Sequence, residues 1–182
     1  MKQLIIIDCQ HDFIDGTLAC HDASLAVENI INYCHEHPAM EVMYSLDWHK
    51  PTNHSFKING GIWPVHCVQN EWGSQLDERF DSLNERQKPQ VSNKFYKGQV
   101  DEVEEYSAFY AKNEEGEVLN DVSDSHVMIA GIASEFCVME TIRELINDNK
   151  KVTVLKSGLG YVDPEGHMKA LAEYEALGAK IV

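Results

Sequence analysis

Residues 2–8 read KQLIIID, a short apolar run that ends at an aspartate, and similar runs recur along the chain. Longer segments with helical spacing separate these runs, and this alternation is typical of an α/β fold. The sequence therefore predicts a sheet with helices between its strands. The further runs predicted as strands are MEVMYSLD at 40–47, HVMIAGI at 126–132, KVTVLKSG at 151–158, AKIV at 179–182 and, more weakly, QVSNK at 90–94.

Three segments have apolar residues at helical spacing, and residues that favour the start or the end of a helix lie at their boundaries. Pro38 prevents the first helix from continuing, while Asp163 followed by Pro164 opens the third and Gly178 closes it. Because helices connect the strands, we expect parallel strands, right-handed crossovers and helices on both faces of the sheet. We expect residues 1–182 to form one domain. The predicted helices span 24–36, 135–147 and 164–177.

Composition excludes several classes of protein. The formal net charge is -15, from 15 Lys and Arg against 30 Asp and Glu, so the field of the chain repels nucleic acid and anionic membrane surfaces. No stretch approaches a membrane span, and the first apolar run is too short for a signal peptide. The five cysteines lack the pair spacing of zinc sites, which favours reduced thiols. We expect a cytoplasmic protein.

One aperiodic stretch gathers groups that bind metals. Residues 46–54 read LDWHKPTNH, and WPVHC follows at 63–67. The stretch from Trp48 to Gly73 is long for a connection, which favours a functional loop. Three imidazoles and a carboxylate suit zinc, iron or manganese, although loop residues of these types can also lack any joint role. The candidate ligands are Asp47, His49, His54 and His66.

A second group of ionisable residues falls at predicted strand ends. Cys137 lies in the first turn of a predicted helix, with Ser134 as its N-cap, where free N–H groups favour a thiolate. Asp8 could accept the thiol proton, and Lys94 could stabilise both anions. The alternative is that Cys137 is a buried apolar residue, Asp8 a turn cap and Lys94 a solvated lysine. Carboxyl ends of parallel strands share one edge, so we expect these residues to be neighbours.

Taken together, these segments resemble the isochorismatase-like cysteine hydrolases, and among them the nicotinamidases. The resemblance spans nearly the whole chain, and its pieces come in the order of that family. These are IIIDCQHDF at 5–13, DWHKPTNHSF at 47–56, GGIWPVHCV at 60–68, KGQVDEVEEYSAF at 97–109, GIASEFCV at 131–138 and the segment from 162 to 182.

The resemblance implies a Rossmann-like fold and a role for each matching residue. It implies a catalytic triad of Asp8, Lys94 and Cys137, and one divalent metal, zinc or else iron or manganese, on the four candidate ligands. It further implies a cis peptide between Ile132 and Ala133, with the N–H groups of Ala133 and Cys137 facing an oxyanion. The residues implied to bind substrate are Phe13, Trp63, Tyr106 and Ile132.

The implied activity is hydrolysis of nicotinamide to nicotinate and ammonia, and of pyrazinamide, through a thioester, in pyridine nucleotide salvage. Gln69–Trp72 and Lys156–Gly158 depart from the usual pattern, and the first departure leaves the amide substrate open. Alternatives are an amidase for a carbamoyl or ureido compound, a metal-binding module without turnover, and a redox sensor. The expected partner is a small-molecule amide substrate, and binding to nucleic acid or to a membrane is not expected. A homo-oligomer is possible.

Overall fold

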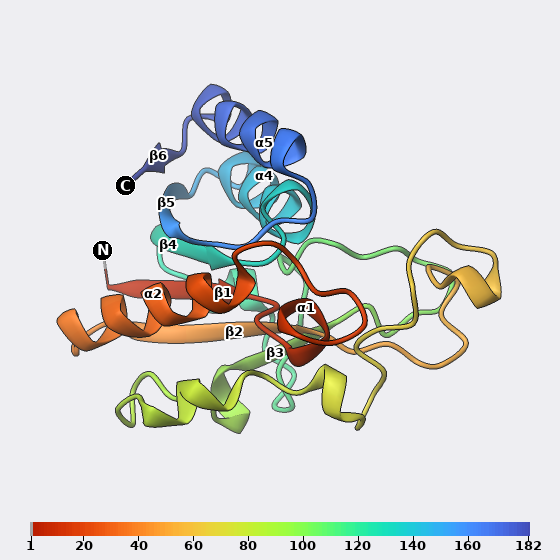
Figure 1. Cartoon of the computed structure of the whole chain (residues 1–182). Coiled ribbons are helices and arrows are strands. Elements are labelled where there is room, and N and C mark those ends of the chain that lie inside the picture. Colours follow the sequence, from red (N-terminus) through yellow and green to blue (C-terminus); the bar gives the residue numbers. More distant parts are fainter. Residues whose placement is uncertain (1) are drawn as a thin grey trace.

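Residues 2–182, described by a computed structural model, are built on one six-stranded parallel sheet (Figure 1). The strands follow the order β3-β2-β1-β4-β5-β6, and every neighbouring pair is parallel. The strands are β1 (Gln3–Ile7), β2 (Glu41–Asp47), β3 (Lys94–Lys97), β4 (His126–Gly131), β5 (Lys151–Leu159) and β6 (Lys180–Ile181). The helices are α1 (His11–Ile14), α2 (Ala23–Glu36), α3 (Leu119–Val122), α4 (Met139–Asn147) and α5 (Pro164–Leu177).

The predicted α/β class and parallel sheet are confirmed, and so are the strands at the five stronger apolar runs. The weaker strand is misplaced, because residues Val91–Asn93 form a short 3-10 turn and β3 begins only at Lys94. Polar side chains close that turn: the Gln90 N–H donates to Asn93 Oδ1 at 2.6 Å, and the Gln90 side chain accepts in return. A reciprocal cap of this kind competes with a strand ladder for the same backbone groups.

The predicted helices at 24–36 and 164–177 correspond to α2 and α5. Asp163 caps α5 by accepting a hydrogen bond of 2.6 Å from the Gly166 N–H, and Gly178 ends it with φ of 98°. The predicted helix at 135–147 is divided, since Ser134–Val138 form a π-helical turn before α4. The prediction of Ser134 as N-cap is wrong, because its hydroxyl contacts His167 Nδ1 at 2.8 Å instead.

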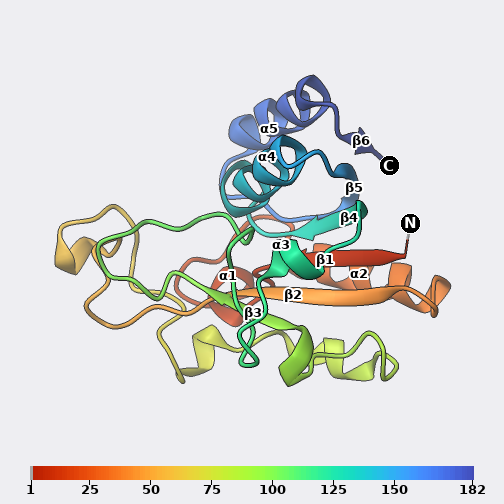
Figure 2. The same ribbon diagram turned by 180° about the vertical axis from the view of Figure 1, so that it is seen from behind.

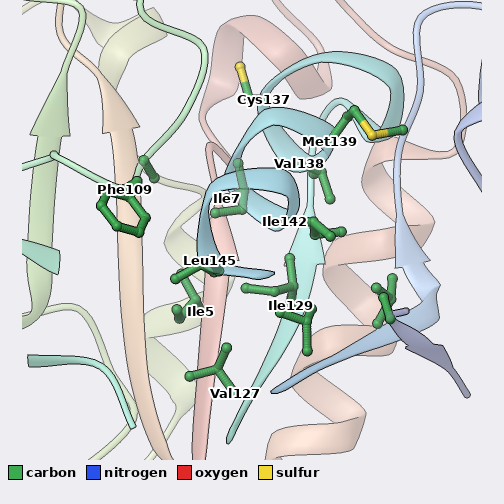
Figure 3. Close-up of a cluster of buried hydrophobic side chains, with 14 of the residues drawn as sticks. Ile5, Ile7, Phe109, Val127, Ile129, Cys137, Val138, Met139, Ile142 and Leu145 are labelled. Carbon is green, nitrogen blue, oxygen red and sulfur yellow. The ribbon is translucent and has the colours of Figure 1, made fainter. Parts of the chain in front are cut away.

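Two apolar layers hold the helices against opposite faces of the sheet. Side chains of successive strand residues point to opposite faces, so Ile5 and Ile7 face α4 and α5 while Leu4 and Ile6 face α2. Figure 3 shows the first layer, in which Ile142 and Leu145 of α4 pack over Ile5 and Ile129. In Figure 1 α2 lies in front of the sheet, and in Figure 2, seen from behind, it lies on the far side.

The strand order places a crevice between β1 and β4. From β1 the chain builds outward through β2 and β3 on one side, and from β4 through β5 and β6 on the other. Connections that leave neighbouring strands in opposite directions open a crevice at their carboxyl ends. Gly131 ends β4 there with φ of 126°, and a Cβ at this position would lie 2.1 Å from the Ile7 carbonyl oxygen. Glycine therefore permits the close approach of the two strand ends.

Long loops cover this carboxyl edge of the sheet. In Figures 1 and 2 the segments after β2 and β3 extend side by side beyond the strand ends. The His54 N–H donates to the Asp101 carbonyl oxygen at 3.0 Å, which ties the two segments together. Across residues 2–182, no helix has both the length and the apolar character that crossing a membrane would require.

Candidate active site

Four neighbouring strands each deliver one ionisable side chain to the carboxyl edge. Asp8 follows β1, Asp47 ends β2 and Lys97 ends β3, where the register pairs it with Asp47. Cys137 comes from the π-helical turn after β4. Figure 3 shows the Cys137 side chain beyond the end of β1, pointing away from the apolar layer beneath it. Residues far apart in sequence therefore meet at one place.

Lys97 lies at the centre of this group. Its Nζ is 2.8 Å from Asp8 Oδ2, donates to Asp47 Oδ1, and lies 3.5 Å from Cys137 Sγ. Ser45 Oγ donates to the other oxygen of Asp8 at 2.6 Å. The side chains of Lys97 and Asp8 are fully buried. Breaking a buried ion pair by removing one partner typically costs about 3–5 kcal/mol, because a charge is then left buried without compensation.

The prediction that Lys94 joins Asp8 and Cys137 is wrong, since Lys97 occupies that position. Lys94 begins β3, is paired with Tyr44, and is only partly buried. Residues three apart on a strand point to opposite faces, so Lys94 faces a surface hollow beside Trp48 while Lys97 faces the site. The error follows from the misplaced strand. Functional residues lie at the carboxyl ends of parallel strands, and β3 ends at Lys97 rather than at Lys94.

Burial and charge set the protonation of this group. Burial raises the pKa of Asp8, and Lys97 opposes part of that rise. Burial also raises the pKa of the Cys137 thiol well above its usual value, again opposed by Lys97. Burial alone would lower the pKa of Lys97, but Asp47 and Asp8 outweigh it and hold that pKa well above its usual value. The site thus pairs a charged lysine with a protonated thiol.

A carboxylate and two imidazoles form a second cluster beside the first. Asp47 Oδ2 lies 3.4 Å from His49 Nε2 and 3.9 Å from His66 Nε2, and all three side chains are buried. His49 Nδ1 is 2.8 Å from the Gly98 carbonyl oxygen, and His66 Nδ1 is 2.8 Å from that of Pro64. A ring whose Nδ1–H donates to a carbonyl presents the Nε2 lone pair to the site.

This donor set fits a divalent metal ion. One nitrogen or oxygen from each of Asp47, His49 and His66 lies within 4.8 Å of the others, as ligands of one ion require. Burial raises the pKa of Asp47, but Lys97 and His49 lower it more, so the carboxylate is charged. Burial lowers the pKa of His66, which favours the neutral imidazole that metals bind. Burial also opposes protonation of His49, but Asp47 raises its pKa overall.

The prediction of His54 as a fourth ligand is wrong. Its side chain is exposed and lies outside the group of donors formed by the other three residues. The turn explains this: Asn53 is buried, its Oδ1 accepts from the Ser55 N–H at 2.9 Å, and it lines the pocket. The residue that follows Asn53 in this tight turn is directed toward solvent.

An aromatic pocket adjoins both clusters, and Asp47, His49 and His66 lie in its wall. Phe13, Trp63 and Tyr106 line it, as the resemblance implied, together with Ala133 and Cys137. Ile132 does not line it: its side chain is fully buried in the apolar layer next to α2, so the structure does not bring this residue to the pocket and its contact with substrate stays a prediction. The Ile132–Ala133 peptide is cis, as expected.

Sequence reasoning missed several residues of the pocket wall. Phe136 packs edge-on against Trp63 with 5.1 Å between ring centroids, and Glu104 accepts a hydrogen bond from Trp63 Nε1 at 3.0 Å. The position of Phe136 one residue before Cys137 is a signal that could have indicated it. The resemblance indicates Tyr106 in the same segment, but no pattern distinguishes Glu104 from the other acidic residues of this loop.

The chain matches the family model described as Isochorismatase domain over residues 2–182. It belongs to the isochorismatase domain family. Within this family it is 30% identical over 207 residues to the nicotinamidase of Escherichia coli, covering 99% of this chain and 93% of that protein.

Solved structures of similar proteins share the fold. The pyrazinamidase of Pyrococcus horikoshii in complex with zinc has a TM-score of 0.83 at 28% identity, covering 99% of this chain and 97% of that one. The PnC1 protein of L. infantum in complex with nicotinate has a TM-score of 0.83 at 27% identity, covering 99% of this chain and 91% of that one. The sheet and helices described above are therefore the isochorismatase-like α/β fold.

Proposed function

We propose that this protein hydrolyses nicotinamide to nicotinate and ammonia, and that it also accepts pyrazinamide. The observation that carries the proposal is that Cys137, Asp8 and Lys97 meet beside an aromatic pocket shared with Asp47, His49 and His66. Membership in the family and the similarity to nicotinamidases make the chain a hydrolase that acts on an amide. A relative bound to nicotinate supports a pyridine ring as the occupant of the pocket.

We assign the metal to Asp47, His49 and His66, whose donor atoms converge. A divalent ion bound there would offer a coordination position to the ring nitrogen of the substrate, which would orient the amide toward Cys137. A zinc complex of a relative supports zinc, and the donor set also suits iron and manganese. Phe13 and Trp63 then hold the ring from the pocket wall.

Proton transfer begins between Cys137 and Asp8. Asp8 takes the thiol proton, and Sγ attacks the carbonyl carbon of the amide. The N–H groups of Ala133 and Cys137 stabilise the oxyanion that forms. When the tetrahedral intermediate collapses, the carbon–nitrogen bond breaks and Asp8 returns its proton to the leaving nitrogen, which departs as ammonia. A thioester between Cys137 and the nicotinoyl group remains.

Water completes the reaction. Asp8 takes a proton from a water molecule, which attacks the thioester carbon, and the proton returns to the Cys137 sulfur as nicotinate leaves. Lys97 keeps its charge throughout, because its position between Asp8 and Asp47 stabilises the ammonium form. Its role is to balance the negative charge that moves between Asp8 and the sulfur.

We further propose that residues 1–182 act as one domain in the cytoplasm, in pyridine nucleotide salvage. All five cysteines are free thiols, which suits a reducing compartment. A small amide is the proposed partner, and the number of copies in the functional assembly is a separate measurement by light scattering.

Ammonia release from purified, metal-loaded protein tests the proposed function. Nicotinamide, pyrazinamide and a set of carbamoyl and ureido compounds should be compared at equal concentration, with nicotinate measured by chromatography. Nicotinamide should give the highest kcat/KM, with one nicotinate formed per ammonia. If a ureido compound is hydrolysed and nicotinamide is not, the proposed substrate is wrong and the ureido compound takes its place. If no amide is hydrolysed, a metal-binding module without turnover is favoured.

A further inference from the structure

The mouth of the pocket holds a carboxylate between two of its aromatic side chains. Glu104 Oε1 accepts hydrogen bonds from Trp63 Nε1 at 3.0 Å and from the Tyr106 hydroxyl. Trp63 Nε1 also lies 3.0 Å from the Tyr106 hydroxyl oxygen, so the three groups form a closed network. Burial and the hydrogen bond with Glu104 raise the pKa of Tyr106, which keeps the phenol a donor. The carboxylate is therefore fixed beside the opening.

Apart from the metal proposed for Asp47, His49 and His66, the charged groups that line the pocket have one sign. Glu104, Glu105 and Asp47 line it, and among residues 2–182 no lysine or arginine does. Glu105 Oε2 accepts from the Gly98 N–H at 2.7 Å, which holds this second carboxylate in place. Lys97 lies behind the wall and is already paired with Asp8 and Asp47. Lys97 therefore does not neutralise Glu104 or Glu105, and the proposed metal would be held by Asp47, His49 and His66 instead.

The proposed reaction changes the charge of the bound molecule. Nicotinamide is neutral, whereas nicotinate carries a carboxylate. Opposite or like charges a few ångströms apart interact measurably even in water, and salt screens that interaction. Glu104 lines the same pocket as Cys137, beside which the product carboxylate forms, so it would repel the product and leave the neutral substrate almost unaffected.

We propose that Glu104 is a specificity residue that selects neutral amides against carboxylates and weakens the binding of the anionic product. This inference rests on the proposed function, because it takes nicotinate as the product. It extends that function to a substrate class: neutral aromatic amides are accepted, and amides that bear a carboxylate on the ring are discriminated against.

Glu104→Gln tests the charge with little change of shape. A glutamine retains the side-chain oxygen that accepts from Trp63 and Tyr106, so the network can persist without its charge. The measured quantity is the ratio of the inhibition constant of nicotinate to the KM of nicotinamide. We expect this ratio to fall about two- to fivefold in Glu104→Gln, and the difference from the wild type to shrink at high salt.

Two matched variants separate charge from position. Glu104→Asp retains the charge on a shorter side chain and should keep the ratio near that of the wild type. Glu102→Gln removes an exposed charge from the same loop that does not line the pocket, and should leave the ratio unchanged. The inference would be overturned if the ratio of inhibition constant to KM in Glu104→Gln equalled that of the wild type, or if Glu102→Gln lowered this ratio as much as Glu104→Gln does. The proposed function would stand in either case. Failure of the wild type to hydrolyse nicotinamide would instead overturn both.

Discussion

Lys97 and Asp8 form an ion pair of 2.8 Å in which neither side chain is exposed to solvent. The pair joins the ends of β3 and β1, with β2 between them, and the lysine also contacts Asp47 and Cys137. A buried cation requires compensating negative charge nearby, and Asp8 and Asp47 supply it to Lys97. The same contacts that hold the lysine place it where negative charge moves in the proposed reaction.

Replacing Lys97 should therefore affect both activity and stability. We expect Lys97→Met to lower kcat/KM for nicotinamide about 100-fold or more. The loss of the cation also leaves Asp8 and Asp47 close together, so the free energy of unfolding should fall by about 3–5 kcal/mol in a urea titration. Lys94→Met is the matched control on the same strand and should stay near the wild type in both measurements. Comparable losses in the two variants would contradict the position assigned to Lys97.

Metal content should distinguish the three histidines. His49→Ala and His66→Ala each remove a donor of the buried cluster, so purified protein should retain less zinc after dialysis against a weak chelator. His54→Ala removes an exposed side chain outside that cluster and should retain as much metal as the wild type. Stripping the metal from the wild type should abolish activity, and adding it back should restore it. Loss of metal in His54→Ala would argue for a fourth ligand.

Gly98 should be required for the orientation of His49. A Cβ at this position would lie 2.4 Å from the His49 ring, and φ is +68°. Gly98→Ala should thus weaken metal binding about 10- to 100-fold, the range found when a group that orients a ligand is lost. Gly116→Ala is the control: φ is +85° there, but nothing lies within 4 Å of a Cβ. Gly116→Ala should therefore lower the free energy of unfolding by about 1–2 kcal/mol, because alanine is strained at positive φ, and should leave the metal affinity unchanged.

The ion pair of Asp77 with Arg79 should make stability depend on pH in the acid range. Burial raises the pKa of Asp77, but bonds from Arg79 lower it more, so its pKa in the folded protein lies below the ordinary value of 3.8. A carboxyl group whose pKa is lower in the folded than in the unfolded protein stabilises the fold at pH values above its unfolded pKa. This stabilisation is lost as the pH falls through its folded pKa. Asp77 also caps the 3-10 turn Glu78–Ser82 by accepting from the Arg79 N–H at 2.9 Å, and Asp77→Asn keeps a capping oxygen without the charge.

Urea titrations of the wild type and Asp77→Asn check this sign. The wild type should be the more stable protein near neutral pH, and its advantage should shrink as the pH falls below 3.8. An advantage that grows on acidification would show that the carboxylate is not stabilised by Arg79.

Much of the fold could be predicted from the sequence, because apolar runs that end at polar residues recur between helical segments. The edge of the sheet where Asp8 and Cys137 meet followed from the rule for parallel strands. The prediction of Lys94 is wrong because the polar turn at 91–93 resembles a strand, and a shift of three residues changes both the face and the end of the strand.

Residues of the loops were harder to predict. Whether His54 or Asn53 points inward depends on a turn that is held both by its own hydrogen bonds, such as that from Ser55 to Asn53, and by the bond from His54 to Asp101 of another loop. Glu104 meets Trp63 across 41 positions of sequence, and no local pattern links them. The spacing of apolar residues indicates which side of a helix or strand is buried. It gives no information where side chains converge from irregular segments.

The central claim is that the Cys137 sulfur attacks the amide carbon, and trapping the thioester tests it most directly. Metal-loaded enzyme should be mixed with nicotinamide, quenched in acid during turnover, digested and examined by mass spectrometry. The account predicts a nicotinoyl group on the peptide that contains Cys137, and neither adduct nor ammonia from a Cys137→Ala variant that retains its metal. Ammonia release by that variant at the rate of the wild type would contradict it.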